Sequence, residues 1–111
     1  MESAINQTSQ SKLASGAAAA GVVWRWSRDL DIEHASNFHA QALTHLRSGQ
    51  SGRLILDLSQ ATRMDAAGLQ ILVAVAVQAL NQGRFFEIAQ APYRIRRYLQ
   101  LAGVGYLLGE E

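Results

Sequence analysis

Two carboxylates, Asp57 and Asp65, are the residues of this sequence best suited to acid–base chemistry. A pair of carboxyl groups can serve as general acid and general base around a bound substrate. No nucleophile and base accompany them at a recognisable spacing. Asp65 stands where an apolar run begins, and a carboxylate there caps the free amides of a helix N-terminus. Asp57 is expected to end a strand and anchor the following turn, so we predict no catalytic residues and no enzymatic activity.

Three histidines, His34, His39 and His45, are the other candidates for chemistry, as metal ligands. They fall on one predicted helix, where His34 and His45 share a face but stand about 16 Å apart at about 1.5 Å per residue. Two ligands so far apart cannot share a metal ion. The sequence has no cysteine, and it contains no phosphate-binding loop or dinucleotide fingerprint. We therefore predict no metal and no cofactor.

The stretch MDAAGL, residues 64–69, joins an apolar strand to a long apolar helix, and Ala66 and Ala67 at its centre carry no reactive atoms. No charged residue occurs from Ala66 to Asn81, although the solvated back of a surface helix is normally charged. On a helical wheel, the face expected to be buried against the sheet consists of Leu69, Leu72, Val73, Ala76, Val77 and Leu80.

The opposite side of this helix is expected to be exposed and includes Ile71 and Val75. An uncharged stripe with two exposed β-branched residues favours docking to another protein, because ions are costly to desolvate at an interface core. The alternative is that the N-terminal tail or a neighbouring loop covers Ile71 and Val75. The predicted partner-binding residues are Asp65, Ala66, Ala67, Gly68, Ile71, Ala74, Val75 and Gln78.

The elements that position these residues follow from periodicity and from turn residues. Strands are predicted at residues 22–27, 54–58, 84–89 and, as a short strand or extended tail, 104–108. Helices are predicted at residues 32–47, started by Asp29 and Asp31, and at 66–81 and 92–102. The strand at 54–58 is nearly all apolar and is therefore placed centrally. Such alternation predicts an α/β fold with a mostly parallel central sheet and helices packed against it.

Composition limits the remaining choices. The 111 residues fit one domain, predicted at 21–111 and preceded by a flexible tail at 1–20 with one weak strand at 4–8. The formal net charge of +1 favours neither nucleic acid nor a membrane surface as a partner. The apolar run after Asp65 is interrupted by polar residues and is shorter than the roughly 20 apolar residues that span a bilayer. With no convincing signal peptide, we expect a cytoplasmic protein without membrane insertion.

A basic patch lies on the third predicted helix, where Arg94, Arg96 and Arg97 follow one another closely. A cluster of this kind is usually a solvated helix face. It is otherwise suited to an acidic partner or to an anionic head group. The sequence leaves these alternatives open.

Three segments resemble the STAS domain, the family of anti-sigma factor antagonists. The most specific is LILDLS, residues 54–59, followed by MDAAGL: it resembles an apolar strand ending in Asp-Leu-Ser and then Asp-Ser-Ser-Gly-Leu at a helix start. WSRDLD, residues 26–31, resembles the strand end and acidic Leu-Asp motif of the family, and residues 93–108 resemble its closing helix and tail. The resemblance covers roughly residues 22–108 and implies a single STAS-like domain.

In the STAS family, the serine just before the signature glycine is the usual phosphorylation target of a partner kinase. The matching residue here is Ala67, and Ala66 stands at the preceding position, which is serine or threonine in other members. Phosphate would add roughly −1.5 to −2 charges at this corner and could switch docking. The resemblance therefore implies a degenerate phosphosite and binding that is constitutive or controlled through the partner.

The resemblance implies a non-enzymatic regulatory module whose partner is a histidine-kinase-like ATPase, such as an anti-sigma factor serine kinase or a chemotaxis-type signalling kinase. The alternative is a STAS subunit of a lipid-trafficking ABC transporter, which would hold its ATPase with the same helix face. A third interpretation is an enzyme or a sensor of small ligands.

Overall fold

Strands and helices alternate along the computed structural model, which describes residues 21–48 and 52–109. The elements are β1 (Gly21–Arg25), α1 (Ala35–Leu46), β2 (Arg53–Asp57), α2 (Ala66–Asn81), β3 (Phe85–Ala89), α3 (Tyr93–Leu101) and the 3₁₀ turn η1 (Gly105–Leu107). This is the predicted order, so the α/β class is confirmed. The expected tail and weak strand fall on residues 1–20, outside the described part.

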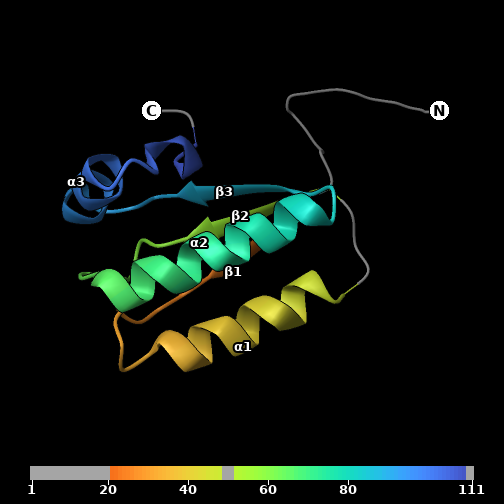
Figure 1. Cartoon of the computed structure of the whole chain (residues 1–111), viewed down its shortest axis with the longest axis horizontal. Coiled ribbons are helices and arrows are strands. Elements are labelled where there is room, and N and C mark those ends of the chain that lie inside the picture. The colour runs from red at the N-terminus through yellow and green to blue at the C-terminus, as the bar shows by residue number, and fades with distance from the viewer. Residues whose placement is uncertain (1–20, 49–51, 110–111) are drawn as a thin grey trace.

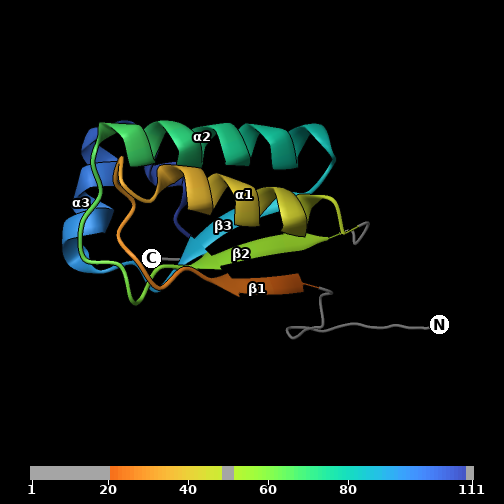
Figure 2. The same ribbon diagram turned by 90° about the horizontal axis from the view of Figure 1, so that it is seen from below.

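β2 lies at the centre of a three-stranded parallel sheet, between β1 and β3. Its pairing with both neighbours confirms the central position predicted from its apolar sequence, and its side chains Leu54 and Leu56 are fully buried on one face. Parallel neighbours require crossover connections, and α1 and α2 supply them. The two helices lie side by side on one face of the sheet (Figures 1 and 2).

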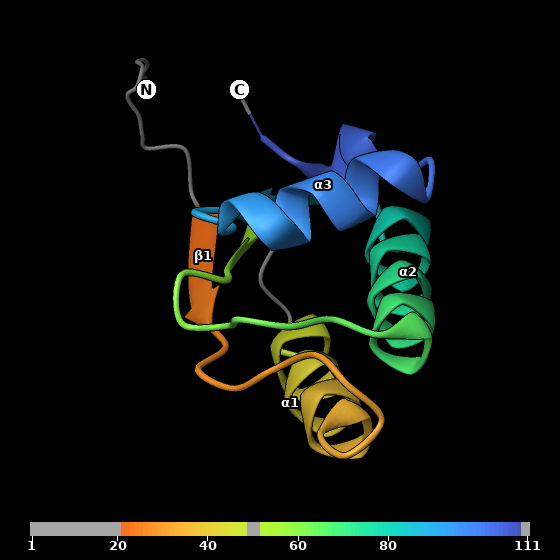
Figure 3. The same ribbon diagram turned by 90° about the vertical axis from the view of Figure 1, so that its left-hand side faces the viewer.

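α3 lies at the carboxyl end of the sheet, where the first turn of α2 also lies (Figures 1 and 3). Pro92 occupies the N-cap of α3 in an extended conformation. After the last turn of α3, Gly103 with φ +82° changes the direction of the chain. The residues expected to be a short strand or tail form η1, after which Leu108 makes a single parallel bridge to Ile88.

The sequence predicts that this helix begins at Ile32, but α1 begins at Ala35. The Asp31 carboxylate accepts a hydrogen bond from the backbone N–H of His34 at 3.1 Å and from the His34 ring Nδ1 at 2.6 Å. Ile32 lies in the turn before the helix, and its backbone N–H donates to the Asp65 carboxylate at 3.0 Å. Its side chain is 78% exposed and does not belong to the buried face of Phe38, Ala42 and Leu46.

The core between the sheet and α1 is aromatic. Trp24 and Trp26 are buried, and both rings contact Phe38 with centroids 4.9 and 5.2 Å away. The Trp24 indole N–H donates to Gln41 at 3.2 Å, and the Trp26 indole N–H donates to the Asp29 carbonyl at 3.1 Å. Both polar atoms of the buried indoles are therefore satisfied.

The other face of the sheet has a different character and carries no helix within the described residues (Figure 2). Ion pairs join neighbouring strands there, Arg25 with Asp57 and Arg53 with Glu87. Among the helices of the described ranges, none combines the length and the hydropathy needed to cross a bilayer.

Candidate partner-docking site

Two loops meet at the carboxyl end of the sheet and form the corner from which α2 starts. The Leu30 N–H donates to the Arg63 carbonyl and the Asp65 N–H donates to the Leu30 carbonyl, both at 3.0 Å. A parallel bridge between Leu30 and Met64 continues this pairing. Because Leu30 is fully buried, the loop after β1 fixes the loop before α2 onto the core.

Asp29 holds this corner together with its carboxylate. Its Oδ1 accepts hydrogen bonds from the Thr62 N–H at 2.8 Å, the Thr62 hydroxyl at 2.9 Å and the Arg63 N–H at 3.1 Å. The backbone bond from Thr62, with the further bonds from Thr62 and Arg63, outweighs partial burial and lowers the pKa of Asp29 to about 2. The sequence suggested only a helix start for Asp29, because its partners lie on a distant loop.

The variant Asp29→Asn is expected to lose about 2 kcal/mol of stability at neutral pH, since hydrogen bonds to a charged acceptor become bonds to a neutral one. The pKa of Asp29 is lower in the folded chain than the ordinary value of 3.8. Its charge therefore stabilises the fold above pH 3.8, and this contribution is lost as the pH falls towards about 2.

Urea unfolding of both proteins at several pH values measures this effect. The stability difference between wild type and Asp29→Asn should shrink through that acidic window. Glu33→Gln removes an exposed carboxylate of the same loop and serves as the control, with an expected change within about 0.5 kcal/mol. A constant difference at every pH would show that the Asp29 charge does not hold the corner.

Asp65 caps α2, as the sequence predicts. Its Oδ1 accepts from the Gly68 N–H at 2.9 Å, and its Oδ2 accepts from the Ile32 N–H at 3.0 Å. The backbone bond from Gly68 is the main cause that lowers the pKa of Asp65, and the bond from Ile32 adds to it. Both oxygens serve backbone groups, so Asp65 organises the corner.

Asp57 anchors a turn, which is also as predicted. Its Oδ1 accepts from the Ser59 N–H at 2.8 Å, and Arg25 lies 3.5 Å from its Oδ2. Burial raises the pKa of Asp57, but the Ser59 hydrogen bond and the Arg25 charge together lower it below its ordinary value. Asp57 thus holds the turn after β2, whereas Asp65 holds the start of α2.

Gly68 is buried at the point where α2 approaches the loop after β1 most closely. A Cβ atom on Gly68 would lie 1.9 Å from the carbonyl oxygen and 2.4 Å from the carbonyl carbon of Leu30. Both obstacles are backbone atoms and cannot rotate away. The glycine of the MDAAGL stretch is therefore required for packing, and it is not an exposed contact residue.

The rotation of α2 differs from the predicted one by about 100°, the angle of one residue step. Val75 was predicted to contact a partner, but it is fully buried, so this prediction is wrong. Ile71 is half-buried and packs against the core, whereas Val77 and Leu80 are 51% and 71% exposed although they were predicted to be buried. The residues of α2 that are buried are Gly68, Leu72, Val75 and Ala79.

The reason for this rotation is the contact between Gly68 and Leu30. It turns the Gly68 side of α2 inward, and the residues that follow at helical spacing are buried with it. Apolar residues occupy every side of α2, so its sequence periodicity alone does not specify which side faces the core.

The outer face of α2 is defined by its exposed residues, Ala66, Gln70, Ala74, Val77, Leu80 and Asn81. The predicted contacts divide accordingly. Ala66 and Ala74 are exposed, whereas four others are half-buried: Asp65, Ala67, Ile71 and Gln78. The outer face is uncharged, and Ala66 and Ala67 bring no hydroxyl to its beginning.

Asp31, Glu33 and His34 gather at the start of α1, with one ligand atom from each within 4.8 Å of the others. The sequence signal for this group, which the three histidines alone do not give, is the short spacing of DIEH at residues 31–34. Asp31 already serves the helix start through its two bonds to His34. Capping of α1 accounts for the arrangement.

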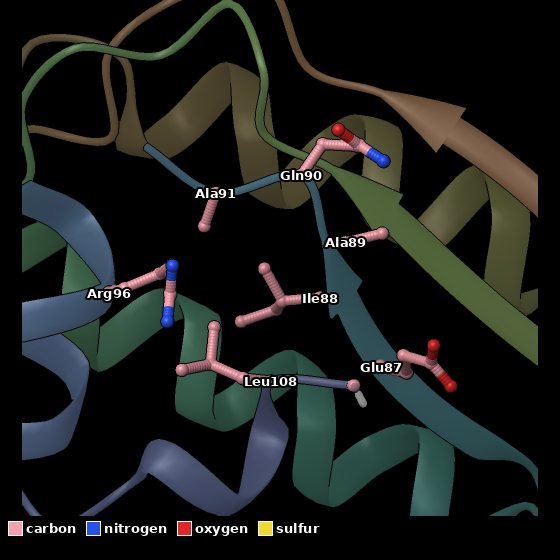
Figure 4. Close-up of a pocket in the computed structure, with 8 residues that line it drawn as sticks. Glu87, Ile88, Ala89, Gln90, Ala91, Arg96 and Leu108 are labelled. Atoms are coloured by element: carbon pink, nitrogen blue, oxygen red, sulfur yellow. The ribbon is translucent and has the colours of Figure 1, made fainter. Parts of the chain in front are cut away.

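A cavity of about 470 Å³ opens beside the carboxyl end of β3 (Figure 4). Its lining residues are Glu87, Ile88, Ala89, Gln90, Ala91, Arg96, Leu108 and Gly109. Figure 4 shows Arg96 reaching from α3 towards Ile88 and Leu108. This lining offers one cation, one carboxylate and apolar contacts, but it contains no nucleophile paired with a base.

Comparisons with known proteins bear on the family and the fold of the chain. A protein-family model described as "Mlab, STAS domain" matches residues 14–109. Among solved structures, the crystal structure of a sulfate transporter family protein from Wolinella succinogenes is similar with a TM-score of 0.69 and 16% sequence identity. The match covers 82% of this chain and 73% of that chain, and it confirms the predicted STAS-like fold.

Proposed function

We propose, from the premise that this chain belongs to the STAS domain family, that it is a cytoplasmic regulatory module that binds an ATPase through the outer face of α2. STAS domains mediate protein–protein interactions and are generally not enzymes. The partner class proposed first is a histidine-kinase-like ATPase, of the anti-sigma factor or chemotaxis-type signalling group.

The observation that carries this proposal is the uncharged outer face of α2. The helix has 16 residues without one charged side chain, whereas α3 has three arginines within nine residues. Val77 and Leu80 expose apolar side chains in the middle and last turns. Such a face loses little on desolvation and gains from apolar contact, which is the composition of an interface core.

The corner before this face supports binding without a phosphorylation switch. Ala66 is exposed and Ala67 is half-buried in the first turn of α2, and neither can accept a phosphoryl group. Their small side chains allow a partner backbone to approach closely. In this proposal, binding is constitutive or is controlled through a change in the partner.

A second candidate function is that of a STAS subunit that holds the ATPase of a lipid-trafficking ABC transporter. The observation that favours it is the structural similarity to a sulfate transporter family protein, which links this fold to transport. The missing hydroxyls at Ala66 and Ala67 fit this candidate equally well, because it needs no phosphorylation cycle.

Binding of the immobilised chain to purified ATPases of its own source organism tests both candidates. One set of analytes is the kinase-like ATPases, and the other is the ABC ATPases with their permeases. Saturable binding by the first set supports the signalling proposal, whereas binding by the second set alone supports the transport candidate. Each complex is also incubated with radiolabelled ATP. No label is expected on this chain, because Ala66 and Ala67 cannot accept a phosphoryl group. Failure of both sets to bind would overturn the proposed function.

A further inference from the structure

A second recess lies beside the corner, between α3 and the turn that leads into α2. It has a volume of about 360 Å³, and its lining residues are Arg63, Met64, Arg94, Ile95, Arg97, Tyr98 and Leu101. We call it the α3 groove. Figure 3 looks onto this end of the molecule, with α3 and the turn before α2 on the near side.

The interior of the α3 groove is apolar. Ile95 is fully buried and forms its base, and Met64 packs against the core from the turn before α2. Leu101 is 74% exposed at the end of α3, and Tyr98 is half-buried one turn earlier. A recess of this size beside an exposed leucine can bind an apolar side chain of another molecule.

The charged groups of the α3 groove all have the same sign. Arg63, Arg94 and Arg97 line it, and no carboxylate does. Arg63 already pairs with Asp29 and Asp31. For the exposed side chains of Arg94 and Arg97, no hydrogen bond or ion pair occurs within residues 21–48 and 52–109.

We propose that the α3 groove binds an acidic segment of a protein partner that inserts an apolar anchor residue between Met64 and Leu101. The carboxylates of such a segment would meet Arg94 and Arg97, whose forked guanidinium groups pair well with carboxylates. This inference rests on the proposed function, because the groove adjoins the first turn of α2 and would extend the same docking surface.

The shape of the groove favours a peptide over a lipid surface. A bilayer supplies anionic head groups but no side chain that projects into a recess. Membrane association of a helix instead depends on apolar residues that protrude from the protein. Ile95 lies at the base of a recess, and the net charge of +1 adds no general attraction to anionic lipids.

The test uses a fluorescein-labelled peptide in which pairs of glutamates alternate with pairs of leucines. The full chain is titrated into this peptide, and binding is measured as the rise in fluorescence anisotropy. Two control peptides have lysine in place of glutamate, or glutamine in place of leucine. The acidic apolar peptide is expected to bind in the micromolar range, and both controls at least tenfold more weakly. Vesicles of phosphatidylglycerol form a separate arm.

Arg94→Glu/Arg97→Glu is expected to weaken peptide binding at least tenfold, and Leu101→Ser by a similar factor. Arg28→Glu/Arg47→Glu makes the same change in net charge at exposed positions outside the groove lining and should bind as the wild type does. Val77→Arg/Leu80→Arg alters only the outer face of α2. It should leave peptide binding unchanged, so failure of the groove and failure of the α2 docking proposal are distinguishable.

Equal peptide binding by Arg94→Glu/Arg97→Glu and Arg28→Glu/Arg47→Glu would overturn the inference. Equal affinity of the wild type for the acidic apolar peptide and for the control peptides would overturn it as well. Binding to the vesicles without binding to the peptide would assign the groove to lipid and overturn it as well. Amide chemical-shift changes should be concentrated at Met64, Ile95 and Tyr98. Changes elsewhere would place the peptide on another surface.

Discussion

The variant Gly68→Ala is expected to lose about 3 kcal/mol or more of its free energy of unfolding, and its Tm is expected to fall by about 15 °C. The new Cβ would lie 1.9 Å from the Leu30 carbonyl oxygen. Ordinary van der Waals contact requires well over 3 Å, so either α2 or the loop after β1 must move. Both movements break the backbone bond from Asp65 to Leu30 and uncover core residues.

Urea unfolding followed by far-ultraviolet circular dichroism measures this loss. Ala74→Gly is the control, because it exchanges the same two residue types on the exposed side of the same helix. It should cost about 1 kcal/mol through helix propensity alone. If Gly68→Ala proved as stable as the wild type, the close approach of α2 to Leu30 would be wrong, and so would the rotation assigned to this helix.

The variant Val77→Arg/Leu80→Arg is expected to weaken binding to the ATPase partner at least 100-fold, which corresponds to about 2.7 kcal/mol. Both side chains are exposed in the free chain, so the variant should fold normally. In a complex, the two guanidinium groups would have to be desolvated within an apolar contact area, and without partners there they would be strongly unfavourable.

Surface plasmon resonance with the partner found as proposed above provides the measurement. Val23→Arg/Phe85→Arg makes the same exchange at side chains that are 65% and 77% exposed on the open face of the sheet. This control should bind within about twofold of the wild type. Undiminished binding by Val77→Arg/Leu80→Arg, with the control also unaffected, would remove the outer face of α2 from the interface.

Local signals in the sequence were sufficient to predict the order of the elements. The apolar strand around Leu56 was placed correctly in the centre of the sheet from its nearly all-apolar sequence, although only the face of Leu54 and Leu56 is fully buried and Ile55 on the other face is half-buried. Asp65 was correctly predicted to cap α2, because a cap depends on residues three or four positions away. The two-residue period of a strand puts Trp24 and Trp26 on the same face of β1, and both side chains are buried.

Features that depend on contacts between distant loops could not be predicted in this way. The rotation of α2 depends on the approach of Gly68 to Leu30, and the bond from the Ile32 N–H to Asp65 joins the turn before α1 to the start of α2. The sequence therefore indicated an uncharged helix but assigned Val75 to the wrong side of it. In the same way, the basic patch on α3 could be predicted from the sequence, but the proximity of the apolar residue Met64 to it could not.

The aromatic core has a practical consequence for all of these experiments. Trp24 and Trp26 are the only tryptophans of the chain, and both are almost completely shielded from water beneath α1. The wavelength of their fluorescence emission should therefore increase when the domain unfolds. Occupation of the α2 surface or of the α3 groove should leave that emission nearly unchanged, because neither surface includes these rings. The chain thus carries an intrinsic optical probe of its folded state, and no added dye is needed to separate unfolding from loss of binding.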